Sequence, residues 1–380
     1  MTRTEERASN LEPKTLTVNL GPQKSYKILV SFGWLKELGQ VLKKNGLMRA
    51  DVMVFTSPHI GKLYFDVVEK SLSDAGFQKI ARHNIPDGEK NKNMEEYQNC
   101  LEAMAKEFPD PGSAPLVINL GGGVVGDLGG FAAGTFNRGL PYVQIPTSLL
   151  GCVDCGVGGK VGVNFQNIKN IIGMFYQPKL VFADLALLRT LDIREIRSGT
   201  AEVIKYSVVC DATLNEYLND HIEELIELRP PVLSHVVAEC YRIKSEVVAK
   251  DEKDSKGVRI VLNFGHTVGH ALEMAANYKM THGEAISIGM VAATMIAVKL
   301  GVCSSDVLEN LKQILTRAGL PISAASWRVS SKEIMSNMQH DKKFSEGKNR
   351  FVLPTSIGNW KAVTDIDHEL IRKTVDEVIR

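Results

Sequence analysis

Residues 115–127 read PLVINLGGGVVGD and join a short apolar run to a glycine turn and the start of a second apolar segment. Branched apolar residues dominate 115–121, which is typical of a buried strand. Gly121, Gly123 and Gly126 have the G-x-G-x-x-G spacing, in which backbone amides at a helix N-terminus face a pyrophosphate. The stretch predicts a strand, a tight turn and a helix, with a dinucleotide as a candidate ligand.

The glycine turn also fits a second interpretation. The acidic residue expected about 20 positions further on is missing, because that region is the apolar run 142–148. Glycines that only let a helix pack tightly on a strand would give the same spacing. If a dinucleotide binds here, we expect the domain to depart from the standard Rossmann pattern.

Outward from this turn, strands and helices alternate. Strands are predicted at 26–32, 51–57, 115–121, 142–148 and 180–186, with helices at 34–46, 60–76 and 94–108. Such alternation is typical of parallel strands with helices on both faces. Beyond about residue 186 the apolar spacing is helical, except for a small β element at 350–363. We expect an α/β fold: a disordered leader at 1–14, a Rossmann-like parallel-sheet domain at 15–185 and a mainly α-helical domain at 186–380.

Composition excludes several classes of function. The formal net charge of +1 offers no surface for nucleic acid or an anionic membrane, and no apolar run approaches the length of a membrane helix. Six cysteines are scattered through 380 residues, unlike a secreted disulfide scaffold. Cys152 and Cys155 have C-x-x-C spacing without a second pair, and we interpret them as buried thiols. The sequence predicts a cytoplasmic protein.

Three histidines lie close together in NFGHTVGHALEMAANYKMTHGEA (263–285). Imidazole is a good zinc ligand, and His266, His270 and His282 each stand beside a glycine. Helix geometry alone pairs His266 with His270 at i and i+4, and it brings the Glu284 carboxylate to the same place as His282. The cluster predicts a metal or catalytic site.

The centre of the chain is rich in lysine and asparagine. The polar residues there, many in or beside the glycine-rich stretches 156–164 and 169–173, are Arg138, Asp154, Lys160, Asn164, Lys169, Asn170, Glu202 and Lys205. Lysines in glycine loops suit phosphates and carboxylates, so we expect an anionic, oxygen-rich substrate. Glu202 and Lys205 alone, at i and i+3 of a helix, would also suit an ordinary ion pair.

These stretches together resemble the 3-dehydroquinate synthase family, within the sugar phosphate cyclases. The motifs that match in order and spacing are GGGVVGDLGGF (121–131), RGLPYVQIPTSLL (138–150), VDCGVGGKVGVN (153–164), KNIIGMFYQPK (169–179), SGTAEVIKY (198–206), LNFGHTVGHALE (262–273), HGEAISIGM (282–290) and HDKKFSEGKNRFVL (340–353). The resemblance runs from about residue 20 to the C-terminus. It implies a homodimer with an NAD-binding α/β domain and a helical metal- and substrate-binding domain.

The resemblance also implies a role for individual residues. Zinc, with cobalt as a substitute, would be held by Glu202, His266 and His282. The substrate would be lined by Asp154, Lys160, Lys205, Lys244, Arg259 and Asn263, with Lys244 and Arg259 meeting its carboxylate. Its phosphate would contact His270, Lys160, Asn170, Lys343 (or its neighbour Lys342) and Arg138 of the partner subunit. NAD would contact Glu89, Lys92, Gly122, Gly123, Asp127, Thr147, Ser148, Lys160 and Lys169.

The implied reaction converts 3-deoxy-D-arabino-heptulosonate 7-phosphate to 3-dehydroquinate and phosphate, with NAD recycled within each turnover. The chain departs from the family pattern V-D-S-S-V-G-G-K-T-G-V-N at Cys155, Gly156 and Val161. A small residue and glycine after Asp154 resemble natural-product cyclases that act on sedoheptulose 7-phosphate. A natural-product cyclase with an amino substrate is part of the same alternative. Those relatives generally lack counterparts of His270, Arg259 and Asn263, which this chain has. A metal-dependent polyol dehydrogenase is a third alternative, although a neutral polyol needs no such lysines.

Overall fold

The computed structural model describes residues 12–166, 168–339 and 349–380. By its internal contacts the chain forms two compact units. Unit 1 comprises residues up to Thr190 together with Leu233–Glu252, and unit 2 comprises Leu191–Val232 and Lys253–Arg380. The expected fold class, an α/β part with a parallel sheet and a helical C-terminal part, is confirmed. The expected division into two functional domains, with a boundary between residues 185 and 186, stays a prediction.

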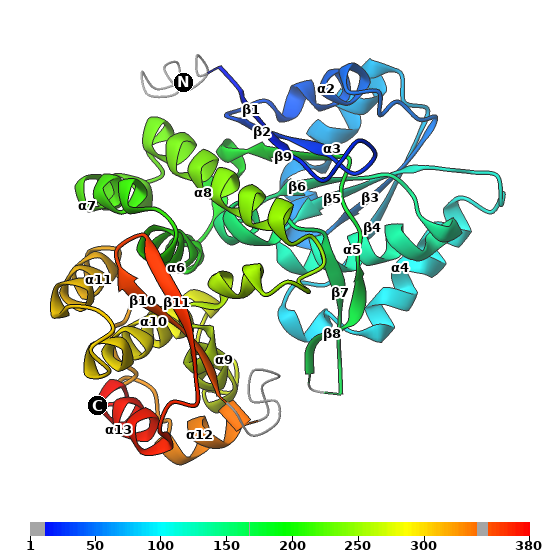
Figure 1. Ribbon diagram of the computed structural model, residues 1–380. Coiled ribbons are helices and arrows are strands. Elements are labelled where there is room, and N and C mark those ends of the chain that lie inside the picture. Colours follow the sequence, from blue (N-terminus) through cyan, green and yellow to red (C-terminus); the bar gives the residue numbers. More distant parts are fainter. Residues whose placement is uncertain (1–11, 167, 340–348) are drawn as a thin grey trace. The chain divides into compact units, whose positions relative to one another are not determined.

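Unit 1 is built on a seven-stranded sheet with the order β1-β2-β9-β6-β5-β3-β4 (Figure 1). Its strands are β1 (Lys14–Val18), β2 (Tyr26–Ser31), β3 (Asp51–Thr56), β4 (Lys79–Asn84), β5 (Leu116–Gly121), β6 (Tyr142–Pro146) and β9 (Leu180–Asp184). Neighbouring strands are parallel except for β1 and β2. Loops that follow β4, β5 and β6 therefore leave the sheet at one edge, where ligands of open α/β sheets bind.

Helices cover both faces of this sheet. The helices of unit 1 are α2 (Leu38–Lys44), α3 (Pro58–Ala75), α4 (Met94–Glu107) and α5 (Gly123–Thr135), together with most of α8 (Pro230–Lys250). Because side chains alternate along a strand, Val54 and Ile118 pack with α2 and α3, whereas Met53 and Val117 pack with α4 and α5. The glycine turn thus joins a strand of the packed sheet to a helix of the layer that covers it, and this packing fixes the position of the turn.

Four strands, β1, β4, β7 and β8, were not expected from the sequence. β4 reads KIARHN and is an edge strand, so it has neither the alternation nor the continuous apolar run of a buried strand. β7 (Lys160–Phe165) and β8 (Ile168–Phe175) form an antiparallel pair where glycine and asparagine content suggested loops. The expected helix 34–46 is a 3-10 turn, Leu35–Glu37, followed by α2. β1 begins at Lys14, the last residue of the expected leader, and residues 1–11 lie outside the described part.

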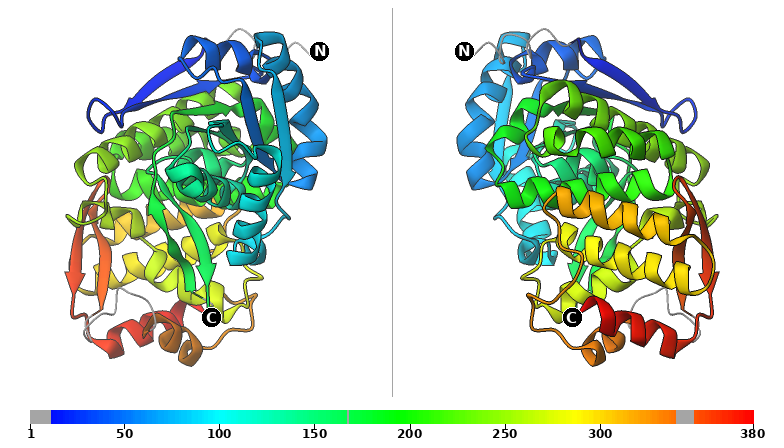
Figure 2. Two further views of the ribbon diagram at one scale, coloured as in Figure 1. Left: turned by 90° about the vertical axis from the view of Figure 1, so that its right-hand side faces the viewer. Right: turned by 90° about the vertical axis from the view of Figure 1, so that its left-hand side faces the viewer.

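Unit 2 is mainly helical. Its helices are α6 (Ile193–Val209), α7 (Ala212–Ile226), α9 (His266–Ala275), α10 (His282–Lys299), α11 (Ser305–Arg317), α12 (Ser331–Gln339) and α13 (His368–Val378). The small β element is the hairpin of β10 (Arg350–Ser356) and β11 (Asn359–Thr364), which Figure 2 shows beside helices of this unit. α10 is apolar and buried on nearly all sides, so α6 and α9 pack directly against it.

Among the described residues, no helix combines the length and the apolar character that crossing a membrane requires.

Candidate metal centre and ligand-binding residues

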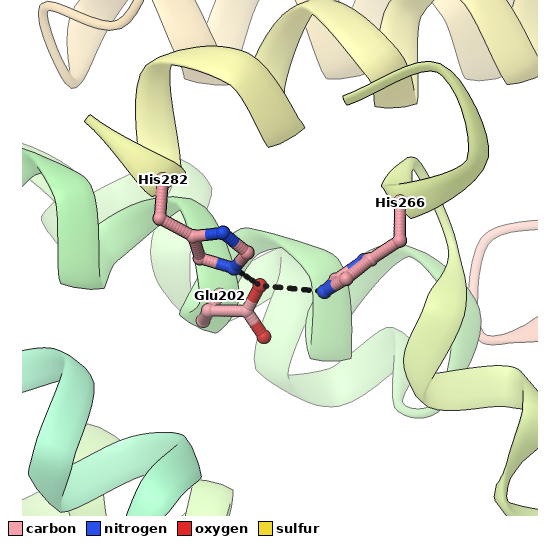
Figure 3. Close-up of side chains that lie close together, drawn as sticks. All are labelled: Glu202, His266 and His282. Atoms are coloured by element: carbon pink, nitrogen blue, oxygen red, sulfur yellow. Dashed lines mark ion pairs between the residues drawn. The ribbon is translucent and has the colours of Figure 1, made fainter. Parts of the chain in front are cut away.

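Glu202, His266 and His282 converge in unit 2. The Nε2 atom of His282 lies 3.4 Å from Oε1 of Glu202, and that of His266 lies 3.6 Å from the same oxygen (Figure 3). One ligand atom of each residue falls within 4.8 Å of the other two, and Glu202 is completely buried. Two imidazole nitrogens and a carboxylate at this spacing suit a divalent transition metal such as zinc.

The other nitrogen of each ring already has an acceptor. Nδ1 of His266 lies 3.0 Å from the carbonyl oxygen of Phe264, and Nδ1 of His282 lies 3.4 Å from Oε1 of Glu273. Since neither acceptor can donate, each Nδ1 carries a proton, and each Nε2 is the nitrogen that faces Glu202 and would bind a metal ion after losing any proton of its own. Burial lowers the pKa of His282, but Glu202 and Glu273 outweigh it and raise that pKa to about 9. The two carboxylates make this a site for a cation.

Glycines allow the three segments to approach closely. A Cβ atom on Gly283 would lie 2.3 Å from the carbonyl oxygen of Ser198 on α6, the helix that carries Glu202. A Cβ atom on Gly265 would lie 2.8 Å from the backbone nitrogen of Met290 on α10, and Gly265 has a φ of +80°. The glycines beside the histidines therefore have a packing role, because they bring the ends of α9 and α10 within reach of Glu202.

Replacing Gly283 with alanine is expected to destabilise the protein by about 1–3 kcal/mol, the usual cost of overpacking. Alanine is the better helix former, so a loss would reflect crowding against Ser198 rather than helix propensity. Chemical denaturation measures the change. Gly112→Ala is the control, since a Cβ atom there meets nothing closer than 3.4 Å. Equal stability of the Gly283→Ala and Gly112→Ala variants would contradict the packing argument.

Two expectations from helix geometry are corrected. His270 does not join the Glu202 group; its ring centroid lies 5.2 Å from that of His266, and its ligand atom groups with Glu273 and His282 instead. Glu284 points away, because its carboxylate accepts a hydrogen bond from the backbone nitrogen of Thr281 and pairs with Arg194. It caps α10 rather than facing the histidines.

Glu273 was missed by the sequence analysis. It lies on α9 and is buried, with its carboxylate toward His282. The sequence held a signal for Glu273 in its spacing. Glu273 stands seven residues after His266 and three after His270, which places all three on the same face of one helix. An acidic residue at that spacing favours a partner for one of the histidines.

Glu202 forms the ion pair with Lys205 that the sequence allowed, and it also groups with the two histidines. The Lys205 ammonium contacts Oε2 of Glu202, and both side chains are almost fully buried. Oε1 faces the histidines, so one carboxylate serves both contacts. Arg259 and Asn263 lie on the 3-10 turn Val258–Asn263, which leads into α9, and Arg259 is only 4% exposed.

A second group of polar side chains lies in unit 1. The buried Lys92 ammonium contacts the side-chain oxygens of Asp127 and Asn170. Burial by itself lowers the pKa of Lys92, but Asp127 and Glu89 outweigh it and raise that pKa, so the lysine stays charged. Asn164 joins the group through hydrogen bonds to Glu89 and Asn170. The group lies beside α5, the helix that carries Asp127.

The glycine turn ends at the N-terminus of α5. Gly122 is the N-cap residue, and no side chain of the described residues caps this helix start. Thr147 and Ser148 follow β6; the Thr147 amide donates to the Gly121 carbonyl at 3.0 Å, and a Cβ atom on Gly122 would lie 3.5 Å from the Ser148 hydroxyl. Backbone amides without a side-chain cap, beside hydroxyls, suit an anionic group such as a pyrophosphate.

The remaining predicted residues that the structure describes lie in unit 1. Lys244 donates to the Asp154 carboxylate at 2.6 Å within unit 1. Lys160 and Lys169 lie on the β7–β8 hairpin, where Lys160 is exposed and Lys169 half-buried. Arg138 is exposed, with a φ of +61°. Lys342 and Lys343 lie outside the described residues.

The cysteine pair differs in part from expectation. Cys152 is buried, and burial raises the pKa of its thiol to about 12, so it is unreactive. Cys155 is exposed, and a Cβ atom on Gly123 would lie 3.3 Å from its sulfur. Neither forms a disulfide.

Comparison with known proteins agrees with this geometry. The family models 3-dehydroquinate synthase N-terminal and C-terminal match residues 82–198 and 199–344. A 3-dehydroquinate synthase of Crocosphaera subtropica is 40% identical over 366 residues, 96% of this chain and 98% of that protein.

Solved structures are similar over almost the whole chain. ValA, a 2-epi-5-epi-valiolone synthase from Streptomyces hygroscopicus with NAD+ and Zn2+ bound, has a TM-score of 0.83 at 26% identity, covering 95% of this chain and 98% of its own. A 2-deoxy-scyllo-inosose synthase shares the fold, with a TM-score of 0.84 at 21% identity over 96% of this chain and 100% of its own. The fold is that of the sugar phosphate cyclases. Within that class, the chain belongs to the 3-dehydroquinate synthase family and is an enzyme.

Proposed function

We propose that this enzyme converts 3-deoxy-D-arabino-heptulosonate 7-phosphate into 3-dehydroquinate and inorganic phosphate. The observation that carries the proposal is family membership along 96% of the chain, at 40% identity to a 3-dehydroquinate synthase. The Glu202, His266 and His282 cluster, with Lys205 beside it, supports it. The reaction consists of an oxidation, loss of phosphate by elimination, a reduction and an intramolecular aldol closure.

We infer that Glu202, His266 and His282 hold a divalent cation, zinc or cobalt in its place. The fit rests on the donor set, in which both Nε2 atoms face one carboxylate oxygen while both Nδ1 atoms have acceptors. Three protein ligands leave coordination positions for substrate oxygens. ValA, with Zn2+ bound, supports the assignment.

NAD is assigned to the carboxyl edge of the sheet in unit 1. The start of α5 at Gly122 and Gly123 suits the pyrophosphate, because its first amides have no side-chain cap among the described residues. The other residues assigned to the cofactor are Glu89, Lys92, Asp127, Thr147, Ser148, Lys160 and Lys169. ValA also binds NAD+, which supports the assignment.

When bound, NAD supplies reversible hydride transfer at the reacting carbon, and the divalent cation polarises the hydroxyl group there. The protein's own residues bind and orient the substrate. Arg259 and Lys244 meet its carboxylate, and the Asp154 carboxylate holds the Lys244 ammonium in place at 2.6 Å. Lys205 and Asn263 complete the lining. Cationic side chains stabilise the phosphate as it leaves. This phosphate itself removes the acidic C–H proton next to the transient ketone.

The phosphate is assigned to His270, Lys160, Asn170 and Lys343, together with Arg138 of the partner subunit. Arg138 is exposed on its own subunit, which suits a residue that acts across a dimer. The enzyme is therefore proposed to be a homodimer. We also propose a cytoplasmic location, an NAD-binding domain at 15–185 and a metal- and substrate-binding domain at 186–380.

A cyclase that acts on sedoheptulose 7-phosphate is the second candidate. The exposed Cys155 beside Gly123 favours it, since this replacement changes the surface next to the assigned cofactor turn. Val161 does not, because it is buried in the core against Gly130, where a Cβ atom would lie 2.5 Å away. The retained Arg259, Asn263 and His270 favour the heptulosonate.

Phosphate release tests the proposal. The heptulosonate phosphate is expected to be consumed with many turnovers per NAD and without lasting absorbance at 340 nm, because the hydride returns within each cycle. Omitting NAD should abolish the release. Faster release from sedoheptulose 7-phosphate would favour the second candidate. Stoichiometric accumulation of NADH would instead indicate a polyol dehydrogenase and contradict both.

A further inference from the structure

Asn164 uses both ends of its side chain to join two segments of unit 1. Its Nδ2 donates to Oε1 of Glu89 at 2.9 Å, and its Oδ1 accepts from the backbone nitrogen of Asn170 at 2.8 Å. Its own backbone nitrogen donates to the carbonyl oxygen of Lys92 at 2.9 Å. One residue therefore contacts both ends of the 89–92 turn and the start of β8.

The position of Asn164 within the hairpin explains this reach. The pairing of β7 with β8 shifts register between Val163 and Phe165, so Asn164 lies at an irregularity of the ladder. A β-bulge turns a side chain away from the regular alternation and is often found next to functional sites. At this irregularity the side-chain amide of Asn164 reaches both the 89–92 turn, through its Nδ2, and strand β8, through its Oδ1.

The contacts of Asn164 form a closed ring. Asn164 holds the backbone of Asn170, the side chain of Asn170 contacts the Lys92 ammonium, and the backbone of Lys92 returns to Asn164. Asn170 has a φ of +54°, a left-handed conformation that needs support from its surroundings. A hydrogen bond to its amide supplies part of that support.

We propose that Asn164 is a positioning residue that aligns Glu89 for the cofactor and Asn170 for the substrate phosphate. This inference rests on the proposed function, which assigns ligands to Glu89 and Asn170 but none to Asn164. Because a hydrogen bond to a carboxylate fixes its direction, loss of the amide leaves Glu89 free to turn away. The two ligand sites are then coupled through one side chain.

Asn164→Ala is expected to raise the NAD dissociation constant about tenfold, which corresponds to about 1.4 kcal/mol. The KM for the heptulosonate phosphate should rise as well, because Asn170 loses its anchor, while kcat at saturating NAD and substrate stays close to that of the wild type. Isothermal titration with NAD and steady-state kinetics measure these values. Asn99→Ala is the matched control: Asn99 is also half-buried in unit 1 and donates to a glutamate, Glu96, at 3.1 Å.

Asn164→Asp separates the two contacts. Its carboxylate still accepts from the amide of Asn170 but repels Glu89, so NAD binding should weaken about tenfold while the substrate KM changes by less than about twofold. In a Glu89→Gln background, Asn164→Ala should weaken NAD binding much less than in the wild type. Asn164→Asp also decides the matter if the alanine variant fails to fold.

Failure of this inference is distinct from failure of the proposed function. If the wild type binds no NAD, the cofactor assignment is wrong. If the wild type binds NAD and both Asn164 variants bind it equally well, Asn164 is not a positioning residue. Loss of thermal stability in Asn164→Ala, with unchanged NAD affinity in Asn164→Asp, would likewise reduce its role to folding.

Discussion

Replacing His266 with alanine is expected to lower kcat/KM for phosphate release by at least about a thousandfold. Polarisation by a metal ion contributes several kcal/mol to transition-state stabilisation, and each 1.36 kcal/mol is a factor of ten, so a loss of about 4 kcal/mol gives this value. His266 is 9% exposed and its Nε2 lies 3.6 Å from Oε1 of Glu202, so the alanine variant loses one of the three donor atoms of the cluster. Kinetics and metal content are measured on the same sample.

The control for this variant is His59→Ala, since His59 lies exposed on α3 of the other unit. It should keep full activity and metal content. Chelation of the wild type should abolish activity, and Zn2+ or Co2+ should restore it. Full activity in a metal-stripped variant with alanine at both His266 and His282 would show that the cluster is not the metal centre.

The sequence predicted much of the metal centre but not its geometry. The three histidines were visible within 17 residues, each beside a glycine, whereas Glu202 lies 64 positions before His266 and was assigned only through the family resemblance. Spacing alone paired His266 with His270. The structure turns the His266 ring to Glu202, because the Phe264 carbonyl holds its Nδ1. A contact to a neighbouring backbone carbonyl has no signature in residue spacing.

The fold was predicted where burial makes the sequence regular. β3, β5, β6 and β9 are buried on both faces and are mostly apolar, so they were found within a few residues. β1 and β4, the edge strands, and β7 and β8, a separate hairpin, were missed because exposed residues interrupt their apolar pattern. Asn164 lies on that hairpin, which is why its contacts could not be predicted.

Arg259→Ala is expected to lower kcat/KM for the heptulosonate phosphate by at least about thirtyfold. Losing one partner of a buried charge pair costs about 2–5 kcal/mol, and the lower value at 1.4 kcal/mol per decade gives this factor. Arg259 is 4% exposed on the turn that leads to His266, so a carboxylate bound there would be shielded from water. The measurement is the initial rate of phosphate release over a range of substrate concentrations.

Two further variants make the role of Arg259 specific. Arg259→Lys keeps the charge but loses the planar fork that matches a carboxylate, so its loss should be intermediate. Arg229→Ala removes an exposed arginine of the same unit and should have no effect. Sedoheptulose 7-phosphate lacks the carboxylate, so Arg259→Ala should leave any activity on it unchanged and shift the preference between the substrates by the full factor. An equal loss on both substrates would mean that Arg259 acts on the fold or the phosphate and not on the group that distinguishes them.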